Sequence, residues 1–363
     1  MSFESIADLF GEQWLGPLGG LAIGVAFGFL AQRSAFCLRA ATLEVAHGTL
    51  GERLAVWLLT FSTALIATQA LLQIGLFDTG AVRQLNNRGS LSGAIIGGLL
   101  FGSGMVLTRA CASRMLVLSA TGNLRALLSG LVFAVVAQSS RTGILEPLRA
   151  ALGDIWTISP EARDMLAFTG AGHAGAMAFG SLWLILGIGL AVRNRVRPAT
   201  AAGAAGVGLC VATAWWFTFG HAAISFDPVS VHSLSFTGPS ADMLMFVVAR
   251  PEGALTFDLG LLPGVVAGAA LGGLVGREMR LEGFEGGAAM RRYIAGGCLM
   301  GFGGTLAGGC AVGAGVSGAS IFAFTAWIVL WSMWIGAVLT DWFVDQPARR
   351  AGSAGGLAAG RAN

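Results

Sequence analysis

Residues 97–112 read GGLLFGSGMVLTRACA, and residues 296–311, 199 positions later, read GGCLMGFGGTLAGGCA. Eight of the sixteen positions are identical without a gap, and both copies are apolar, rich in glycine and free of acidic residues. Each copy has the composition of a membrane helix that breaks at its cysteine, Cys111 or Cys310. A duplicated apolar half with a special residue at such a break is typical of many transporters.

The composition also indicates a membrane protein. The chain is 55% hydrophobic and 11% charged, against about 25% charged residues in soluble domains. Its 56 glycines fit this class, because glycine is more frequent in membrane helices than in soluble ones. The net charge of +3 is too small to predict a nucleic-acid partner. Residues 1–13 carry three acidic residues, so we expect no cleavable signal peptide.

Nine segments are long and apolar enough to cross a bilayer, which takes about 20 residues. They lie near residues 14–32, 52–76, 91–108, 122–142, 172–192, 200–219, 258–276, 292–308 and 320–343. The sequence therefore predicts an all-α integral membrane protein of about nine transmembrane helices.

Arginines predict the orientation of these spans. They cluster near 33–53, 109–125, 193–197, 277–292 and 349–350, with fewer in the opposing loops. Cytoplasmic loops carry an excess of basic residues, so we expect a periplasmic N-terminus and a cytoplasmic C-terminus in a bacterial inner membrane.

The odd number of spans makes the two halves inverted. We expect a first repeat at about 14–142, a linking helix at about 172–192 and a second repeat at about 200–343, which together form one transport domain within 1–345. Residues 346–363 form a small tail rich in alanine, glycine and arginine, predicted to be flexible and cytoplasmic. With this topology the break at Cys111 enters from the cytoplasmic side and the break at Cys310 from the outer side.

Each half contains a second break. In the first half it is RSAFCLRAA, residues 33–41, and in the second half it lies within 220–257. The offset of 199 places Cys37 opposite Phe236, between Ser235 and Thr237. Irregular backbone at membrane depth is tolerated only inside protein or beside water. Two short re-entrant segments from each face, meeting near the midplane, therefore imply a central pathway.

The five cysteines fall into two groups. Cys210 and Cys298 lie within predicted spans, where cysteine behaves as a small hydrophobic residue. Cys37, Cys111 and Cys310 lie at the helix breaks. None of the five forms a CxxC pair or a cluster with histidine, so we expect no metal site and no cofactor.

The residues around the breaks favour a small, partly soft anion. Gly308 and Gly309 allow close approach of backbone N–H groups, and Arg109 stands before Cys111 where the second copy has Gly308. Short helices that begin at the breaks direct the positive ends of their dipoles inward. A thiol is a weak donor with a polarisable sulfur, so it suits a sulfur atom better than a hard oxygen.

At these residues the chain resembles the YeeE/YedE family of sulfur transporters. The resemblance rests on the segments RSAFCLRAA, LTRACASRM and LAGGCAVGAG and on the spacing of their cysteines, and it covers about residues 14–345. It implies an inner-membrane protein that takes up thiosulfate past the thiols of Cys310, Cys111 and Cys37, with Cys111 the most critical. It also implies a small cytoplasmic sulfur-carrier protein of the TusA type as a partner. The tail lacks the CPxP signature of such a carrier, so none is fused here.

Two other classes of function stay open. One is a transporter of another species, such as sulfide or a selenium oxyanion. The other is a membrane thiol–disulfide oxidoreductase in which Cys111 and Cys310 exchange a disulfide, although no paired histidines indicate the haem that such an enzyme would use. No Walker motif is present, so we predict a transporter and not an ATP-hydrolysing enzyme.

We interpret most of the remaining ionisable residues as structural. The sequence places Asp341 and Asp345 at the membrane interface and the histidines at 173, 221 and 232 on solvated outer loops. Glu44 and His47 follow Cys37 at helical spacing and are candidates for an inner vestibule. No acidic residue is predicted deep inside a span, which argues against a carboxylate proton relay.

Overall fold

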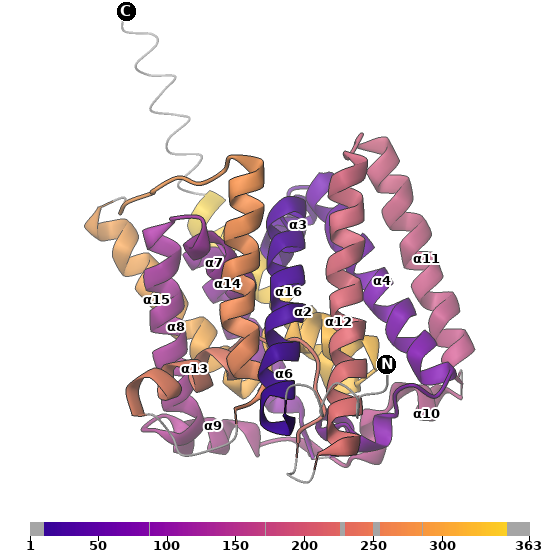
Figure 1. Cartoon of the computed structure of the whole chain (residues 1–363). Helices are drawn as coiled ribbons and strands as arrows, with labels where there is room; N and C mark the ends of the chain where they lie inside the picture. Colours follow the sequence, from indigo (N-terminus) through magenta and orange to yellow (C-terminus); the bar gives the residue numbers. More distant parts are fainter. Residues whose placement is uncertain are drawn as a thin grey trace, which may run out of the picture.

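The computed structural model describes residues 11–86, 88–170, 172–225, 229–249, 255–284 and 286–346. Within these ranges the long helices are α2 (Glu12–Ser34), α4 (Glu52–Gln73), α6 (Leu91–Thr108), α8 (Leu124–Thr142), α11 (Gly172–Arg193), α12 (Pro198–Ile224), α14 (Phe257–Gly276), α15 (Gly287–Leu306) and α16 (Phe324–Thr340). Each of the nine predicted spans coincides with one of them (Figure 1). The predicted tail, apart from Gln346, lies outside the described residues.

Shorter elements connect the long helices. They are α3 (Leu38–Ala46), α5 (Arg83–Asn86), α7 (Ala112–Ala120), α9 (Glu146–Gly153), α10 (Met165–Thr169), α13 (Thr237–Ala249), the 3₁₀ turns η1 (Thr79–Ala81) and η2 (Glu161–Arg163), and the π-helical turns η3 (Gly313–Gly318) and η4 (Asp341–Asp345). Two short strands, β1 (Gly89–Ser90) and β2 (Thr157–Ile158), pair antiparallel. The protein is therefore an all-α membrane protein.

Seven helical segments of the described chain are long and apolar enough to cross a membrane. Helices α8 and α9 pass the same criterion together and meet at a bend of 70°, which gives up to eight. Helix α15 does not pass it, because Arg291 and Arg292 and six glycines lower its hydropathy. A ninth crossing at α15 therefore stays a prediction.

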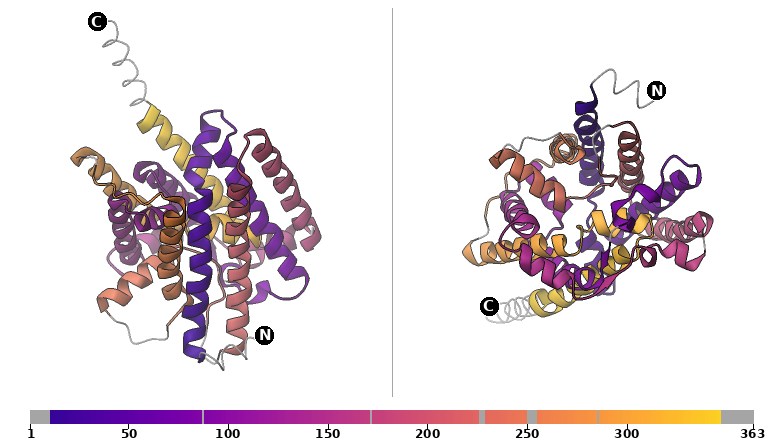
Figure 2. Two further views of the ribbon diagram at one scale, coloured as in Figure 1. Left: turned by 45° about the horizontal axis from the view of Figure 1, so that its top comes forward. Right: turned by 90° about the horizontal axis from the view of Figure 1, so that it is seen from below.

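The long helices pack through glycine faces. Gly16, Gly20, Gly24 and Gly28 line one side of α2, and Gly260, Gly264, Gly268 and Gly272 line one side of α14. A Cβ added at Gly28 would lie 2.2 Å from the Val265 carbonyl oxygen, and one at Gly268 would lie 2.0 Å from the Val25 oxygen. The backbones therefore touch along the whole contact, as small residues at every fourth position allow. Figure 2 (left) shows α2 lying between α14 and α12.

The contacts between elements occur in matching pairs. Helix α2 packs on α14 as α12 packs on α4, and α6 packs on α16 as α15 packs on α8. The short elements follow the same rule: α3 packs on α4 as α13 packs on α14, and α7 packs on α8 as η3 packs on α16. A two-fold repeat predicts this exchange of partners. Superposition of the two halves after inversion stays a prediction.

The two faces of the protein are distinct. We call the face where α2 begins and α12 ends the cleft face, and the face where α2 ends and α12 begins the distal face (Figure 1). Helix α7 runs out to the distal face, where the Thr121 carbonyl accepts a hydrogen bond from the Arg280 N–H. The turn after η3 runs out to the cleft face, where the Phe322 carbonyl accepts one from the Met165 N–H. The two cysteine-bearing segments thus reach opposite faces.

One structural interpretation of an ionisable residue needs correction, and two others gain detail. His221 does not lie on a solvated loop, because α12 extends to Ile224 and packs the ring against α2 at Gly16, leaving the residue 7% exposed. Asp341 and Asp345 are both buried. Each acid has a basic side chain at hydrogen-bond distance: His47 lies 2.7 Å from Asp341, and Arg292 lies 2.6 Å from Asp345. These hydrogen bonds make the burial of the two acids tolerable.

Candidate functional site

The helix breaks lie where the sequence predicts them. Cys37 is the N-cap residue of α3, and Cys111 is the N-cap residue of α7. In the second half Thr237 begins α13, and Cys310 comes shortly before η3. All four short elements begin in the interior and run outward, so the N–H groups of their first turns point inward.

The two copies of the repeat share a backbone conformation at the break. Arg109 ends α6 with a φ of 58°, and its counterpart Gly308 follows α15 with a φ of 79°. The left-handed turn suits glycine and costs an arginine some strain. The Arg109 side chain is exposed at the end of α6, on the distal side of the break.

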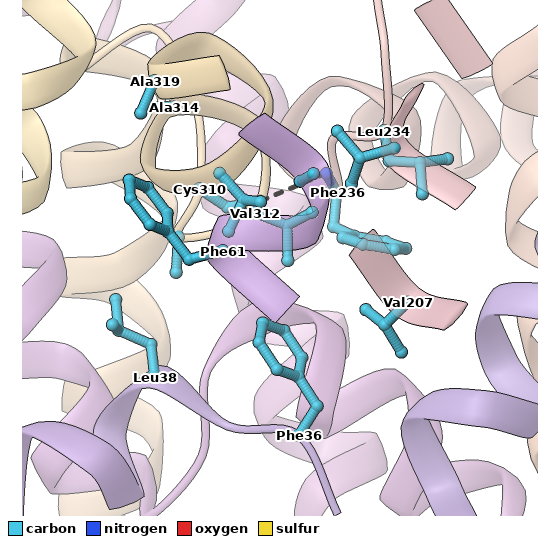
Figure 3. Packing of buried hydrophobic residues seen from close by; sticks show 14 of the residues in the cluster. Phe36, Leu38, Phe61, Val207, Leu234, Phe236, Cys310, Val312, Ala314 and Ala319 are labelled. Carbon is cyan, nitrogen blue, oxygen red and sulfur yellow. Dashed lines mark hydrogen bonds between the residues drawn. The ribbon is translucent and has the colours of Figure 1, made fainter. Parts of the chain in front are cut away.

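The Cys310 sulfur lies between the two short elements of the second half. It accepts hydrogen bonds from the Phe236 N–H at 3.3 Å and from the Gly313 N–H at 3.4 Å (Figure 3). Cys310 is 1% exposed. Because the sulfur already accepts two N–H groups, the S–H group is left to act as a donor.

Cys37 and Cys111 lie together in the first half. Their side chains are close enough to interact, and both are free thiols. The Cys111 sulfur also lies 3.4 Å from the Ser113 hydroxyl. Cys111 is buried, whereas Cys37 is half-buried. The structure therefore brings two of the three predicted thiols close together.

Apolar side chains close the interior around Cys310. Val312 and Phe236 lie beside it in Figure 3, with Phe36 farther away, and each of the three is at most 2% exposed. The Phe236 ring also packs on Phe27 at 5.2 Å between centroids. The described residues thus hold this part of the protein in a closed conformation.

A cleft of about 1210 Å³ opens beside this closed region. Its wall includes Gly308 and Gly309, the two glycines predicted to admit a ligand, together with Thr237 and Gly313. The same cleft is lined by Gln84, Arg141, Arg149, His221, His232, Ser233, Ser235 and Asp242. Polar and charged side chains therefore share the wall of this cleft with apolar ones.

Ion pairs tie the wall of the cleft together. Arg141 donates to Asp242 at 2.7 Å and to the Gly238 carbonyl at 3.2 Å, which joins α8 to the start of α13. Burial raises the pKa of the Asp242 carboxyl above its ordinary value, against the opposing effect of Arg141. His232 lies 3.0 Å from Asp258 at the start of α14.

Charged residues also approach the first-half cysteines from the distal side. Arg39 and Arg114 are close enough to Cys37 to interact with it electrostatically. Arg114 donates to the Gln32 side chain at 3.2 Å, and Gln32 donates to Glu278 at 2.6 Å. These contacts join α7, α2 and the loop after α14.

Glu44 and His47 have structural contacts. The Glu44 carboxylate accepts the N–H groups of Arg53 at 3.2 Å and Leu54 at 2.9 Å, so it caps the first turn of α4. His47 binds Asp341, which ties the end of α3 to α16. A vestibule role for these two residues stays a prediction.

The other two cysteines lie apart from these contacts. Cys210 is buried inside α12, and Cys298 is partly exposed on α15. Among the described residues no group of three or more His, Cys, Asp or Glu side chains is arranged to hold a metal ion.

Sequence reasoning missed part of the cleft. Arg141 and Arg149 are among the arginines of the opposing loops, which were considered only for topology, and Thr237 was named only as a neighbour of Phe236. The spacing of 199 does place Phe236 opposite Cys37, and both lie beside a repeat cysteine. Extending that comparison to the residue that follows would have selected Thr237.

Comparison with known proteins gives a consistent result. The chain is 25% identical to the thiosulfate transporter TsuA of Escherichia coli (strain K12) over 356 residues, which cover 92% of this chain and 96% of that protein. The sequence profile described as Sulphur transport matches residues 33–339, which include all five cysteines and both breaks of each half. The chain therefore belongs to the Sulphur transport (YeeE/YedE) family of membrane transporters.

Proposed function

We propose that this protein takes up thiosulfate across the bacterial inner membrane, with the cleft face outside and the distal face in the cytoplasm. The observation that carries the proposal is a cleft whose wall includes Gly308 and Gly309, the two residues before the buried Cys310, together with the closeness of Cys37 and Cys111 to each other. The 25% identical relative is a thiosulfate transporter, which supports the choice of anion.

Dehydration of the anion explains why thiols line the path. A dianion that leaves water loses many kcal/mol of hydration unless new donors replace it. Cys310 offers its S–H first, near Gly308 and Gly309, and Cys111 and then Cys37 follow. Soft S–H donors hold the terminal sulfur of thiosulfate, and each contact is weak enough to release the ion to the next.

Transport requires no covalent step in this proposal. The thiols act as protonated donors, since a thiolate would repel the anion. The closed packing around Cys310 must open for the ion to pass, and the short elements are the parts of the site with the fewest long-helix contacts. We expect transport without chemical conversion, and a cytoplasmic carrier of the TusA type remains the partner that the resemblance predicts.

Substitution of Cys111 tests the proposal. Cys111→Ala in proteoliposomes should abolish uptake of radiolabelled thiosulfate, while Cys111→Ser, which keeps a donor, should retain more uptake than Cys111→Ala. The matched control is Cys210→Ala, which replaces another buried cysteine outside the proposed path and should transport normally.

The same assay identifies the anion. Unlabelled thiosulfate should compete more strongly than sulfide, selenite or sulfate. Normal uptake by a folded Cys111→Ala protein would refute the path of thiols. A stable thiosulfate-derived adduct on Cys111, detected by mass spectrometry, would replace it with a covalent mechanism.

A further inference from the structure

The first turn of α13 carries a buried hydroxyl with no described partner. Thr237 is 3% exposed, and within the part of the chain that the structure describes no group hydrogen-bonds to its Oγ1 atom. A buried hydroxyl without a hydrogen bond costs about 1–3 kcal/mol. Such a group calls for an explanation, and a role in binding a ligand is one.

The hydroxyl faces the cleft beside the Cys310 thiol. Thr237 lines the cleft, and its Oγ1 atom would lie 3.0 Å from a Cβ added at Gly304 on α15, one turn before Gly308. The residue before it, Phe236, donates its N–H group to Cys310. The hydroxyl therefore belongs to the residue next to the one that holds the Cys310 sulfur, and it lies at the wall of the cleft.

The backbone around Thr237 is suited to oxygen atoms that carry negative charge. Thr237 and Gly238 are the first two residues of a helix of 13 residues, so their N–H groups have no acceptor within the helix. The third residue, Pro239, has no N–H group. The positive end of the helix dipole adds to the field at this point.

Arg141 strengthens the same end of the helix. Its guanidinium donates to the Gly238 carbonyl and to Asp242, so it fixes the first turn of α13 against α8. The hard hydrogen-bond donors at this end of α13 are the Thr237 hydroxyl, the N–H groups of Thr237 and Gly238, and the Arg141 guanidinium. The Cys310 thiol, in contrast, is a soft donor.

We infer that Thr237 binds the oxygen end of the substrate anion while Cys310 binds its sulfur end. The inference rests on the proposed function and adds the orientation of the ion in the cleft. The two ends of thiosulfate differ in the same way as the two donors: the sulfonate oxygens match the O–H and N–H groups of α13, and the terminal sulfur matches the S–H group. Simultaneous contact selects anions that carry both ends.

Three variants of the full chain test this inference in the proteoliposome uptake assay. Thr237→Val removes the hydroxyl at nearly constant volume and should raise the KM for thiosulfate by roughly tenfold to a hundredfold, because a hydrogen bond to a charged group is lost. Thr237→Ser keeps the hydroxyl and should stay within about threefold of wild type. Thr237→Ala serves as a second deletion of the hydroxyl if the valine variant folds poorly.

The matched control is Thr68→Val. Thr68 on α4 is also fully buried with no described partner for its hydroxyl, but it does not line the cleft. This variant should leave the KM unchanged, so it separates ligand binding from a general effect of removing a buried hydroxyl.

The outcomes distinguish the two proposals. A wild-type protein that does not take up thiosulfate refutes the proposed function. Uptake by wild type with an unchanged KM in both Thr237→Val and Thr237→Ala overturns the role of Thr237 alone. An equal rise in KM for Thr237→Ser and Thr237→Val also overturns it, because it would assign the effect to packing.

Discussion

The close contact between α2 and α14 predicts that a single added methyl group destabilises the protein. A Cβ at Gly268 would lie 2.0 Å from the Val25 oxygen, 2.7 Å from its carbonyl carbon and 2.8 Å from its Cα. All three atoms are backbone, so no side chain can rotate away. The Gly268→Ala variant should therefore force the two helices apart.

The size of the effect follows from the geometry. Restoring an ordinary contact of 3.4 Å requires the two helices to separate by about 1.4 Å at this layer. Overpacking of this kind costs about 1–3 kcal/mol, and so close a backbone contact favours the upper end. Replacing glycine by alanine inside a helix stabilises the folded state by about 1 kcal/mol through helix propensity, which offsets part of this cost. We expect a net loss of about 2 kcal/mol in the free energy of unfolding.

Gly130→Ala is the matched control. Gly130 lies inside α8, and a Cβ there would meet no atom within 4 Å. Only the helix-propensity term acts at this position, so the control should be neutral or more stable by up to about 1 kcal/mol. Thermal unfolding of the purified protein in detergent, followed by size-exclusion chromatography, measures both variants. Equal midpoints for Gly268→Ala and wild type would refute the glycine-face packing.

Two further predictions concern the ion pairs and the topology. Asp341→Ala should lower stability by about 1–3 kcal/mol, since it removes the buried carboxylate that hydrogen-bonds to His47 and ties the end of α3 to the end of α16. Asp242→Ala should cost less than about 1 kcal/mol, because both partners of its pair with Arg141 are 40% exposed. Thermal unfolding compares the two variants, and similar losses would contradict the assignment. Single cysteines placed in 277–291 and in 77–90 should react with a membrane-impermeant maleimide from opposite sides, 77–90 from outside, and labelling of both from one side would rule out the inverted topology.

The sequence predicts the positions of the helices and breaks because these depend on local hydropathy and glycine. All nine predicted spans coincide with long helices, and Cys37 and Cys111 are N-cap residues. It does not predict which helices pair. The glycine faces of α2 and α14 are visible as repeats at every fourth position, but their partner depends on the tertiary fold.

The candidate site could be predicted only in part for the same reason. The repeat identifies Cys111, Cys310 and the two glycines before Cys310, since the two copies align without a gap. Cys37 lies close to Cys111 because the tertiary fold brings the starts of α3 and α7 together, which no spacing in the chain reveals. His221 was predicted to be solvated, but the structure buries it. Helix α12 continues beyond the predicted end of its span and carries the histidine into the interior.

The charges around the three thiols suit the direction of the proposed uptake. A dianion moving into the cell works against an inside-negative potential, at about 2.3 kcal/mol per charge for each 100 mV. Cys310, on the cleft side, is held by backbone N–H groups alone, whereas Cys37, on the distal side, lies in the field of Arg39 and Arg114. Fixed charges cannot drive net transport, but they lower the energy of the ion at the point where the membrane potential raises it most. In this arrangement the bound ion can have a similar free energy at each thiol when the membrane potential is present. Similar free energies allow the ion to move from site to site without being held at one of them.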